Sequence, residues 1–254
     1  MAADEGGMMG KHTYVPESCK ELVKALQSLS YTRSIYEVFQ DWLSVSAIAI
    51  SNAVDFRDWK QREEVYLQTV SGYTKAEQER LSEALALLVM ALQREQNTHG
   101  PTDILGQVFH ALELHNKYKG QFFSPPSICE MMGSITLANE SAAQIIAKNG
   151  YIALCEPCIG SGGMVLGAAK AMADWHLNYQ TQLVVTGIDI DIKCVQMAYL
   201  QLSLLGIPAV VIHGNSITNE TWSKWYTPAY ILGGWSLKLQ EAHLEELFQK
   251  KKAA

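Results

Sequence analysis

The chain has 254 residues, of which 48% are hydrophobic and 18% charged, so it can bury a substantial core. Its net charge of −6 is shared by both halves, and we find a basic run only at Lys250–Lys252. A protein that binds DNA by itself is expected to carry a basic surface, because phosphate contacts supply most of the non-specific affinity, so the composition argues against autonomous DNA binding.

No apolar run reaches the roughly 18 residues of a membrane-spanning helix. The N-terminus, with Asp4 and Glu5 near its start, does not resemble a secretory signal, so a cytoplasmic location and no membrane partner are expected. The five cysteines are odd in number and scattered, which argues against a disulfide framework. Cys155 and Cys158 form a CxxC pair, but no second pair or His cluster completes a zinc site. We therefore expect no metal, and interpret the cysteines as small apolar residues around a turn.

The first part of the chain is predicted to be helical. Residues 1–15 are rich in Gly and Met and lack a period, so they are expected to be disordered. Over residues 16–118 the apolar side chains recur at helical spacing, which predicts a helical domain. Thr74-Lys75-Ala76-Glu77 matches a capping box that opens a long helix through about Gln93. A break at residues 100–103 precedes another helix, predicted over residues 104–117.

The second part, residues 119–254, is predicted to be an α/β domain. Gly120 and two prolines interrupt the helices between residues 118 and 126. Short apolar runs then alternate with helical segments, and strands separated by helices of this length imply a parallel sheet. Strands are predicted at residues 152–155, 183–188 and 209–213, with a candidate fourth at 229–232; helices are predicted at 128–139, 141–148, 165–175 and 192–205.

A glycine-rich turn follows the first predicted strand and precedes a predicted helix. Its sequence is Gly160-Ser161-Gly162-Gly163. Glycines let the backbone approach a ligand, and a helix N-terminus directs amide groups at it, so this arrangement favours a nucleotide-like cofactor. The turn lacks the Gly-Lys-Ser/Thr of a P-loop and the spacing of a dinucleotide fingerprint. Because glycines also serve turns that bind nothing, the turn alone is a weak indication.

Further motifs make the indication specific. Glu156-Pro157 stands just before the glycine turn, Gly120-Gln121-Phe122-Phe123-Ser124-Pro125 lies upstream, and Gly187-Ile188-Asp189 ends the second predicted strand. With Asp103-Ile104-Leu105-Gly106, these segments span about residues 103–216. Their sequences and order resemble the adenine-specific DNA methyltransferases, in particular the modification subunits of type I restriction systems. The resemblance implies a Rossmann-like methyltransferase fold, a truncated parallel sheet preceded by an α-helical domain, with S-adenosylmethionine as the cofactor.

The resemblance also assigns roles around the turn. The backbone of Gly160, Ser161, Gly162 and Gly163 would pass under the methionine portion of the cofactor, where a Cβ would clash. Glu156 would face the cofactor's amino group, since a carboxylate suits a cation.

Other roles fall on residues farther along the chain. Asp189 would accept the ribose hydroxyls, and Phe123 and Ser124 would cover the cofactor from the other side. Asn215 stands where the family usually has an aspartate that faces the adenine amino group, and its carbonyl can accept the same hydrogen bond. A simple turn residue is an equally good interpretation of Asn215. Asp191 is interpreted as a helix cap.

The residues for catalysis are not found. Methylation of an exocyclic amine needs an aromatic that stacks the flipped base and an oxygen that accepts from the amine. The family supplies both with an Asn/Asp-Pro-Pro-Tyr/Phe motif after the fourth strand, and no such tetrapeptide occurs in the chain. Trp235, after the candidate fourth strand, offers a stacking surface but no acceptor beside it. Trp225-Tyr226-Thr227-Pro228 also lacks the acceptor, so no catalytic residue is predicted.

Three hypotheses follow. The first is an S-adenosylmethionine-binding relative, incomplete in catalysis, that acts as subunit, regulator or decoy in a restriction-modification context and contacts DNA only within an assembly. The second is an active adenine methyltransferase with a non-standard or partner-supplied motif, and the third is a structural interaction protein with a vestigial pocket. An uncovered strand at residues 152–155 would invite pairing, so a homodimer or a partner protein is expected, unless the helix at residues 239–248 folds over that edge.

Overall fold

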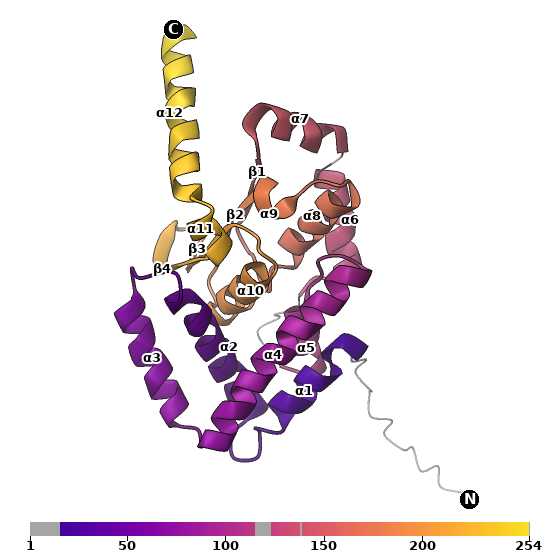
Figure 1. Cartoon of the computed structure of the whole chain (residues 1–254), viewed down its shortest axis with the longest axis vertical. Coiled ribbons are helices and arrows are strands. Elements are labelled where there is room, and N and C mark those ends of the chain that lie inside the picture. The colour runs from indigo at the N-terminus through magenta and orange to yellow at the C-terminus, as the bar shows by residue number, and fades with distance from the viewer. Residues whose placement is uncertain (1–15, 115–122, 138, 254) are drawn as a thin grey trace, which may run out of the picture.

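The computed structural model describes residues 16–114, 123–137 and 139–253. The predicted disordered segment 1–15 and the predicted domain boundary at residues 118/119 lie outside the described residues. The chain begins with helices that pack side by side (Figure 1). They are η1 (Glu17–Cys19), α1 (Lys20–Gln27), α2 (Ile35–Asn52), α3 (Trp59–Ser71), α4 (Lys75–Thr98) and α5 (Ile104–Ala111).

The predicted helix boundaries hold where capping signals are strong. The Thr74 side chain accepts from the Glu77 N–H while the Glu77 carboxylate accepts from the Thr74 N–H, so the predicted capping box opens α4, which continues to Thr98. The helix predicted over residues 104–117 ends earlier, at Ala111. Glu113 has a φ of 53°, and a left-handed residue is a common helix terminator.

The remaining elements alternate between helices and strands. They are α6 (Pro126–Thr136), α7 (Asn139–Asn149), β1 (Ile152–Glu156), α8 (Gly163–Asp174), α9 (Tyr179–Gln182), β2 (Leu183–Asp189), α10 (Ile192–Leu204), β3 (Ala209–Asn215), β4 (Glu220–Tyr226), α11 (Pro228–Leu232) and α12 (Trp235–Ala253). The three predicted strands and the helices between them are confirmed. The chain therefore has the predicted α/β class with a helical region before it.

The sheet has four strands in the order β1-β2-β3-β4. β1, β2 and β3 are parallel, whereas β4 pairs antiparallel with β3. The prediction of a fourth strand at residues 229–232 is wrong, because these residues belong to α11. Pro228 occupies the first helical position, and the Thr227 hydroxyl accepts from the Tyr230 N–H, so the local signals start a helix.

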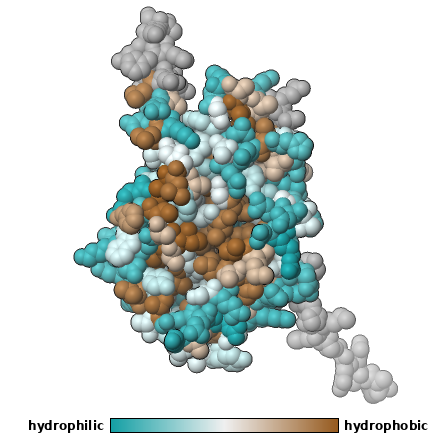
Figure 2. All heavy atoms as spheres, viewed as in Figure 1, coloured by the Kyte–Doolittle hydropathy of each residue, from teal (hydrophilic) through white to brown (hydrophobic). Residues whose placement is uncertain are grey.

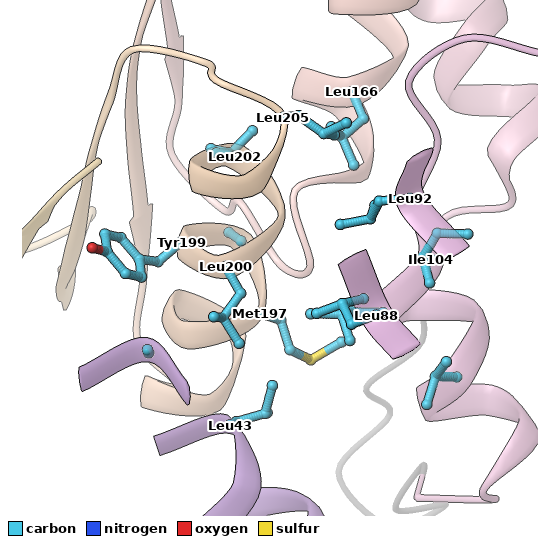
Figure 3. Packing of buried hydrophobic residues seen from close by; sticks show 14 of the residues in the cluster. Leu43, Leu88, Leu92, Ile104, Leu166, Met197, Tyr199, Leu200, Leu202 and Leu205 are labelled. Atoms are coloured by element: carbon cyan, nitrogen blue, oxygen red, sulfur yellow. The ribbon is translucent and has the colours of Figure 1, made fainter. Parts of the chain in front are cut away.

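The main core lies around α10 (Figure 3). Figure 3 shows Leu43 of α2, Leu88 of α4, Ile104 of α5 and Leu166 of α8 directed toward the side chains of α10. All of these side chains are buried in one continuous hydrophobic cluster. The opposite side of α10 packs on β2 and β3. The N-terminal helices and the sheet therefore share a core, with α10 between them.

The C-terminal helices cover only part of the sheet, and the edge at β1 pairs with no further strand among the described residues. β1 is an edge strand, as expected. A small second cluster of Val184, Tyr230 and Trp235 covers part of the other sheet face. α12 packs at its start through Trp235 and Leu239, and then runs away from the body of the molecule (Figure 1). Figure 2 shows apolar residues at the base of α12 and across the middle of this view. No helix among the described residues is long and apolar enough to span a membrane.

Candidate functional site

The glycine turn connects β1 to α8 and lies against the end of β2. Gly160 and Gly162 have φ values of 55° and 97°, which glycine adopts without the strain of a side chain. The Gly162 N–H donates to the Ile159 carbonyl at 2.8 Å, and the Ile159 N–H donates to the Ile188 carbonyl at 2.9 Å. These bonds fix the turn to β2. The first two residues of α8, Gly163 and Met164, line the cavity over the turn.

Asp189 fixes the same turn with its side chain. Its carboxylate accepts from the Gly160 N–H and from the Asp191 N–H, both at 2.9 Å. Burial raises the pKa of Asp189 above its usual range. Asp191 is the predicted helix cap: its carboxylate accepts from the Lys193 N–H at 3.0 Å at the start of α10.

A buried polar network joins the turn to the helical region. Asp103, the N-cap of α5, is 4% exposed. It accepts from the Gly106 N–H at 2.7 Å, from the Gln201 amide at 2.9 Å and from the Ser161 hydroxyl. The fully buried Gln201 also donates to the Ser161 carbonyl at 2.7 Å and accepts from the Leu105 N–H at 3.0 Å. α5, the glycine turn and α10 are therefore locked together.

A cavity of about 290 Å³ opens over the turn at the carboxyl ends of β1 and β2. Six of the nine predicted site residues line it. The complete lining is Asp103, Phe123, Ser124, Cys129, Cys158, Ile159, Gly160, Ser161, Gly163, Met164, Asp189 and Cys194. A larger hollow of about 380 Å³ lies among α2, α3 and α4, but no glycine turn or strand-end acid borders it, so we place the candidate site over the turn.

The other three predicted site residues, Glu156, Gly162 and Asn215, are not among the residues that line the cavity. The Glu156 carboxylate accepts from the Cys158 N–H at 3.2 Å within the turn. Gly162, within the turn, packs against α10: an added Cβ would lie 3.5 Å from the Cα of Ala198. The Asn215 side-chain oxygen accepts from the N–H groups of residues 217 and 218 at 2.9 and 3.3 Å, as a turn residue does. Residues 120–122 of the upstream motif lie outside the described residues.

In the sequence, Asp103 is part of the motif Asp103-Ile104-Leu105-Gly106 without a role of its own, and no motif contains Gln201. Asp103 carried one usable signal, an acid directly before a helix with a glycine at the third helical position. Gln201 carries none, because a glutamine within a helical segment that also contains Gln196 and Ser203 does not stand out in the sequence.

Three of the five cysteines, Cys19, Cys129 and Cys194, are buried, and the other two are exposed. Cys129 and Cys194 are buried in the cavity wall, and burial raises the pKa of Cys129 to about 11. Cys155 and Cys158 are exposed. The interpretation of the cysteines as small apolar residues around a turn does not fit Cys155 and Cys158, whose side chains are exposed because β1 is an edge strand and the turn faces solvent. No group of three or more His, Cys, Asp or Glu suited to a metal occurs within the described part of the chain.

The aromatic residues considered for base stacking serve the fold instead. Trp235 is 3% exposed, and its ring lies 5.3 Å from the Tyr151 ring in an edge-to-face contact. The suggestion that Trp235 offers a stacking surface is therefore wrong. Trp225 and Tyr226 belong to β4, and an arginine from the helical region covers each ring, Arg62 at 4.6 Å and Arg57 at 3.6 Å from the centroid.

Comparisons with known proteins give a family match and distant structural similarities. The model of a family described as N-6 DNA Methylase matches residues 101–241, more than half of the chain. One similar solved structure, from Listeria monocytogenes, is described as a class I S-adenosylmethionine-dependent methyltransferase; it has 12% identity and a TM-score of 0.42, over 80% of this chain and 55% of that one. Another is the methyltransferase subunit of a type I restriction-modification system from Streptococcus thermophilus, with 16% identity and a TM-score of 0.39, over 84% of this chain and 42% of that one. This chain thus spans about half the length of both structures. A search of curated proteins finds no match.

Proposed function

Because the chain belongs to the N-6 DNA methylase family, we propose that its cavity binds S-adenosylmethionine. This membership confirms the resemblance inferred from the sequence motifs. The observation that carries the proposal is the cavity in which the glycine turn, Asp189 and Phe123 meet. It lies at the carboxyl ends of parallel strands, where α/β folds bind nucleotide-like ligands.

The residues present suit this cofactor. An added Cβ on Gly163 would lie 3.2 Å from the Cys129 sulfur and 3.3 Å from the Asp103 carboxylate, so a side chain at this position would push against two other residues of the cavity lining. The Asp189 carboxylate accepts two N–H groups and retains lone pairs for the ribose hydroxyls. The Phe123 ring forms a wall beside Gly160. The cavity volume is close to the lower end of the range, about 300–1,000 Å³, of small-molecule sites.

Binding does not by itself provide transfer. When bound, S-adenosylmethionine supplies an electrophilic methyl group on a sulfonium. Its delivery to a base requires a stacking aromatic and an acceptor oxygen at the target amine. The chain has no Asn/Asp-Pro-Pro-Tyr/Phe motif, and the candidate aromatic Trp235 is buried. The chain therefore binds the cofactor without methylating DNA alone, as a cytoplasmic subunit, regulator or decoy in a restriction-modification assembly.

The assembly part of the proposal rests on two exposed features. β1 is an edge strand, and unpaired edges invite pairing. At the base of α12, Phe56 and Leu237 are 76% and 66% exposed and border a hollow of about 600 Å³. A homodimer or a partner protein would cover these features, and DNA would be reached only through it. Light scattering at micromolar concentration is expected to show an assembly, and a clean monomer without any isolated partner would contradict it.

Calorimetric titration with S-adenosylmethionine tests the binding. Asp189→Ala should weaken it by roughly 10- to 100-fold, because hydrogen bonds to a charged group contribute about 1.5–3 kcal/mol. Asp174→Ala is a matched control, since Asp174 is exposed on the far end of α8 in a pair with Lys170. Absence of binding to clean wild-type protein would contradict the proposal and favour an interaction protein with a vestigial pocket.

A second assay tests the missing chemistry. Labelled methyl transfer to DNA is measured with the purified chain alone and with candidate partner chains. We expect no transfer by the chain alone. Transfer by the chain alone would show an active methyltransferase with a non-standard motif, and would overturn the proposal of catalytic incompleteness.

A further inference from the structure

The amino group of S-adenosylmethionine is positively charged and needs an acidic partner in the cavity. The family resemblance assigns Glu156 to this role. However, Glu156 is not among the residues that line the cavity, whereas Asp103 is. We infer that Asp103, rather than Glu156, receives the cofactor's ammonium group; the inference rests on the proposed function.

Asp103 is placed at the cavity wall. It lines the cavity from the N-terminal side of α5, although it precedes the glycine turn by 58 residues in the sequence. Its carboxylate lies 3.3 Å from the position of an added Cβ on Gly163, the first residue of α8. The space that the missing side chain of Gly163 leaves is therefore bordered by a carboxylate oxygen of Asp103.

The charge of Asp103 is not balanced by a side chain. Its partners are neutral donors, namely the Gly106 N–H, the Gln201 amide and the Ser161 hydroxyl. Among the described residues, none forms an ion pair with it, and the cavity lining contains a second acid, Asp189, but no Lys, Arg or His. A buried carboxylate is costly unless it is paired. A cationic ligand supplies the missing partner.

The network around Asp103 also sets the direction of its carboxylate. Oδ1 accepts from both Gly106 and Gln201, whereas Ser161 is the one donor to Oδ2 among the residues that the structure describes. A carboxylate oxygen has two lone pairs. Oδ2 therefore retains one for an ammonium N–H, and it is the oxygen nearest to Gly163. Gln201 and Ser161 are positioning residues in this scheme.

The test uses three ligands that differ in charge and in the amino-acid part. S-adenosylmethionine has the ammonium and the sulfonium, S-adenosylhomocysteine has only the ammonium, and 5′-methylthioadenosine has neither. Each is titrated calorimetrically into wild type and Asp103→Asn, which keeps the shape and removes the charge. Asp103→Asn should lower the affinity for S-adenosylmethionine and S-adenosylhomocysteine by roughly 10- to 100-fold, and the affinity for methylthioadenosine by less than about 3-fold.

Glu156→Gln is the competing variant, and it should change all three affinities by less than about 3-fold. Equal weakening of the three ligands by Asp103→Asn would overturn the inference, because it would mean that Asp103 only holds the turn. A loss confined to the two amino-acid ligands in Glu156→Gln would overturn it as well. If Asp103→Asn does not fold, Asp103→Ser retains an N-cap oxygen without the charge and is read by the same criteria.

The failure of the proposed function has a different signature. Wild-type protein that binds none of the three ligands would overturn that function and this assignment together. Wild-type protein that binds methylthioadenosine as tightly as S-adenosylhomocysteine would leave the cavity a nucleoside site and overturn the assignment of Asp103 alone.

Discussion

Gly167→Ala tests the packing that holds one wall of the cavity. α6 and α8 cross with their backbones in contact, since an added Cβ on Gly167 would lie 2.2 Å from the Cys129 carbonyl oxygen and one on Gly133 would lie 2.4 Å from the Gly167 carbonyl. Both obstacles are backbone atoms, so α6 has to move by about 1 Å to reach ordinary contact.

The expected magnitude follows from two opposing terms. Overpacking typically costs about 1–3 kcal/mol, and contact with backbone places Gly167→Ala at the upper end. Replacing a helical glycine by alanine returns up to about 1 kcal/mol. The net loss of about 2 kcal/mol corresponds to a fall of roughly 4–8 °C in the unfolding temperature. Cys129 of α6 and the preceding Phe123 and Ser124 line the cavity, so the shift of α6 should also weaken cofactor binding.

Thermal unfolding by circular dichroism and calorimetric titration with S-adenosylmethionine measure the two effects. Gly72→Ala is the control, because Gly72 has a φ of −75° at the end of α3 and an added Cβ meets nothing closer than 3.4 Å. It should leave stability unchanged or raise it by up to about 1 kcal/mol. Gly167→Ala protein that unfolds at the wild-type temperature and binds the cofactor normally would refute the argument.

Arg62→Met should lower the free energy of unfolding in urea by about 2–4 kcal/mol, because it removes the buried ion pair with Asp55 and the hydrogen bond from Arg62 to the Lys224 carbonyl of β4. Arg80→Met is the control: it removes an exposed ion pair and should change the free energy of unfolding by less than about 1 kcal/mol. Alkylation mapped by mass spectrometry should modify the exposed Cys155 and Cys158, and cofactor should protect only Cys158; equal protection of both would contradict the site. Burial raises the pKa of Cys19 from 9.0 to about 11, so the native state keeps a proton that the unfolded chain releases. The free energy of unfolding should therefore fall as pH rises from about 9 to about 11. Urea unfolding midpoints measured at pH 8 and pH 10 should differ less in Cys19→Ala than in wild type.

The sequence was most informative where the deciding signals are local. β1, the glycine turn and α8 follow one another within a few residues of chain. Each has a recognisable composition: an apolar run for the strand, glycines for the turn with positive φ, and an alanine-rich segment for the helix. The run Ala229–Leu232 was assigned to a strand because four apolar residues fit either element. The capping pair Thr227-Pro228 decides for a helix.

The parts that could not be predicted depend on contacts between distant segments. Gln201 is 98 residues from Asp103, and no local pattern distinguishes a buried glutamine in a core helix from an exposed one. Likewise, the motif alone does not specify that the Glu156 carboxylate accepts from the Cys158 N–H, or that Glu156 is not among the residues that line the cavity. The motif identifies the turn, and the tertiary structure decides which acid faces the ligand.

The Asp103, Ser161 and Gln201 network has a consequence for the order of folding. Its members come from α5, the glycine turn and α10, so the cavity needs contacts across 58 and 98 residues of chain. Contacts between residues so far apart close late, because the entropy of the intervening loops must be overcome first. During synthesis, Asp103 acquires its partner Gln201 only after α10 has left the ribosome. The helices before Asp103 can therefore form early, but a nascent chain gains the cavity over the glycine turn only when α10 docks between those helices and the sheet.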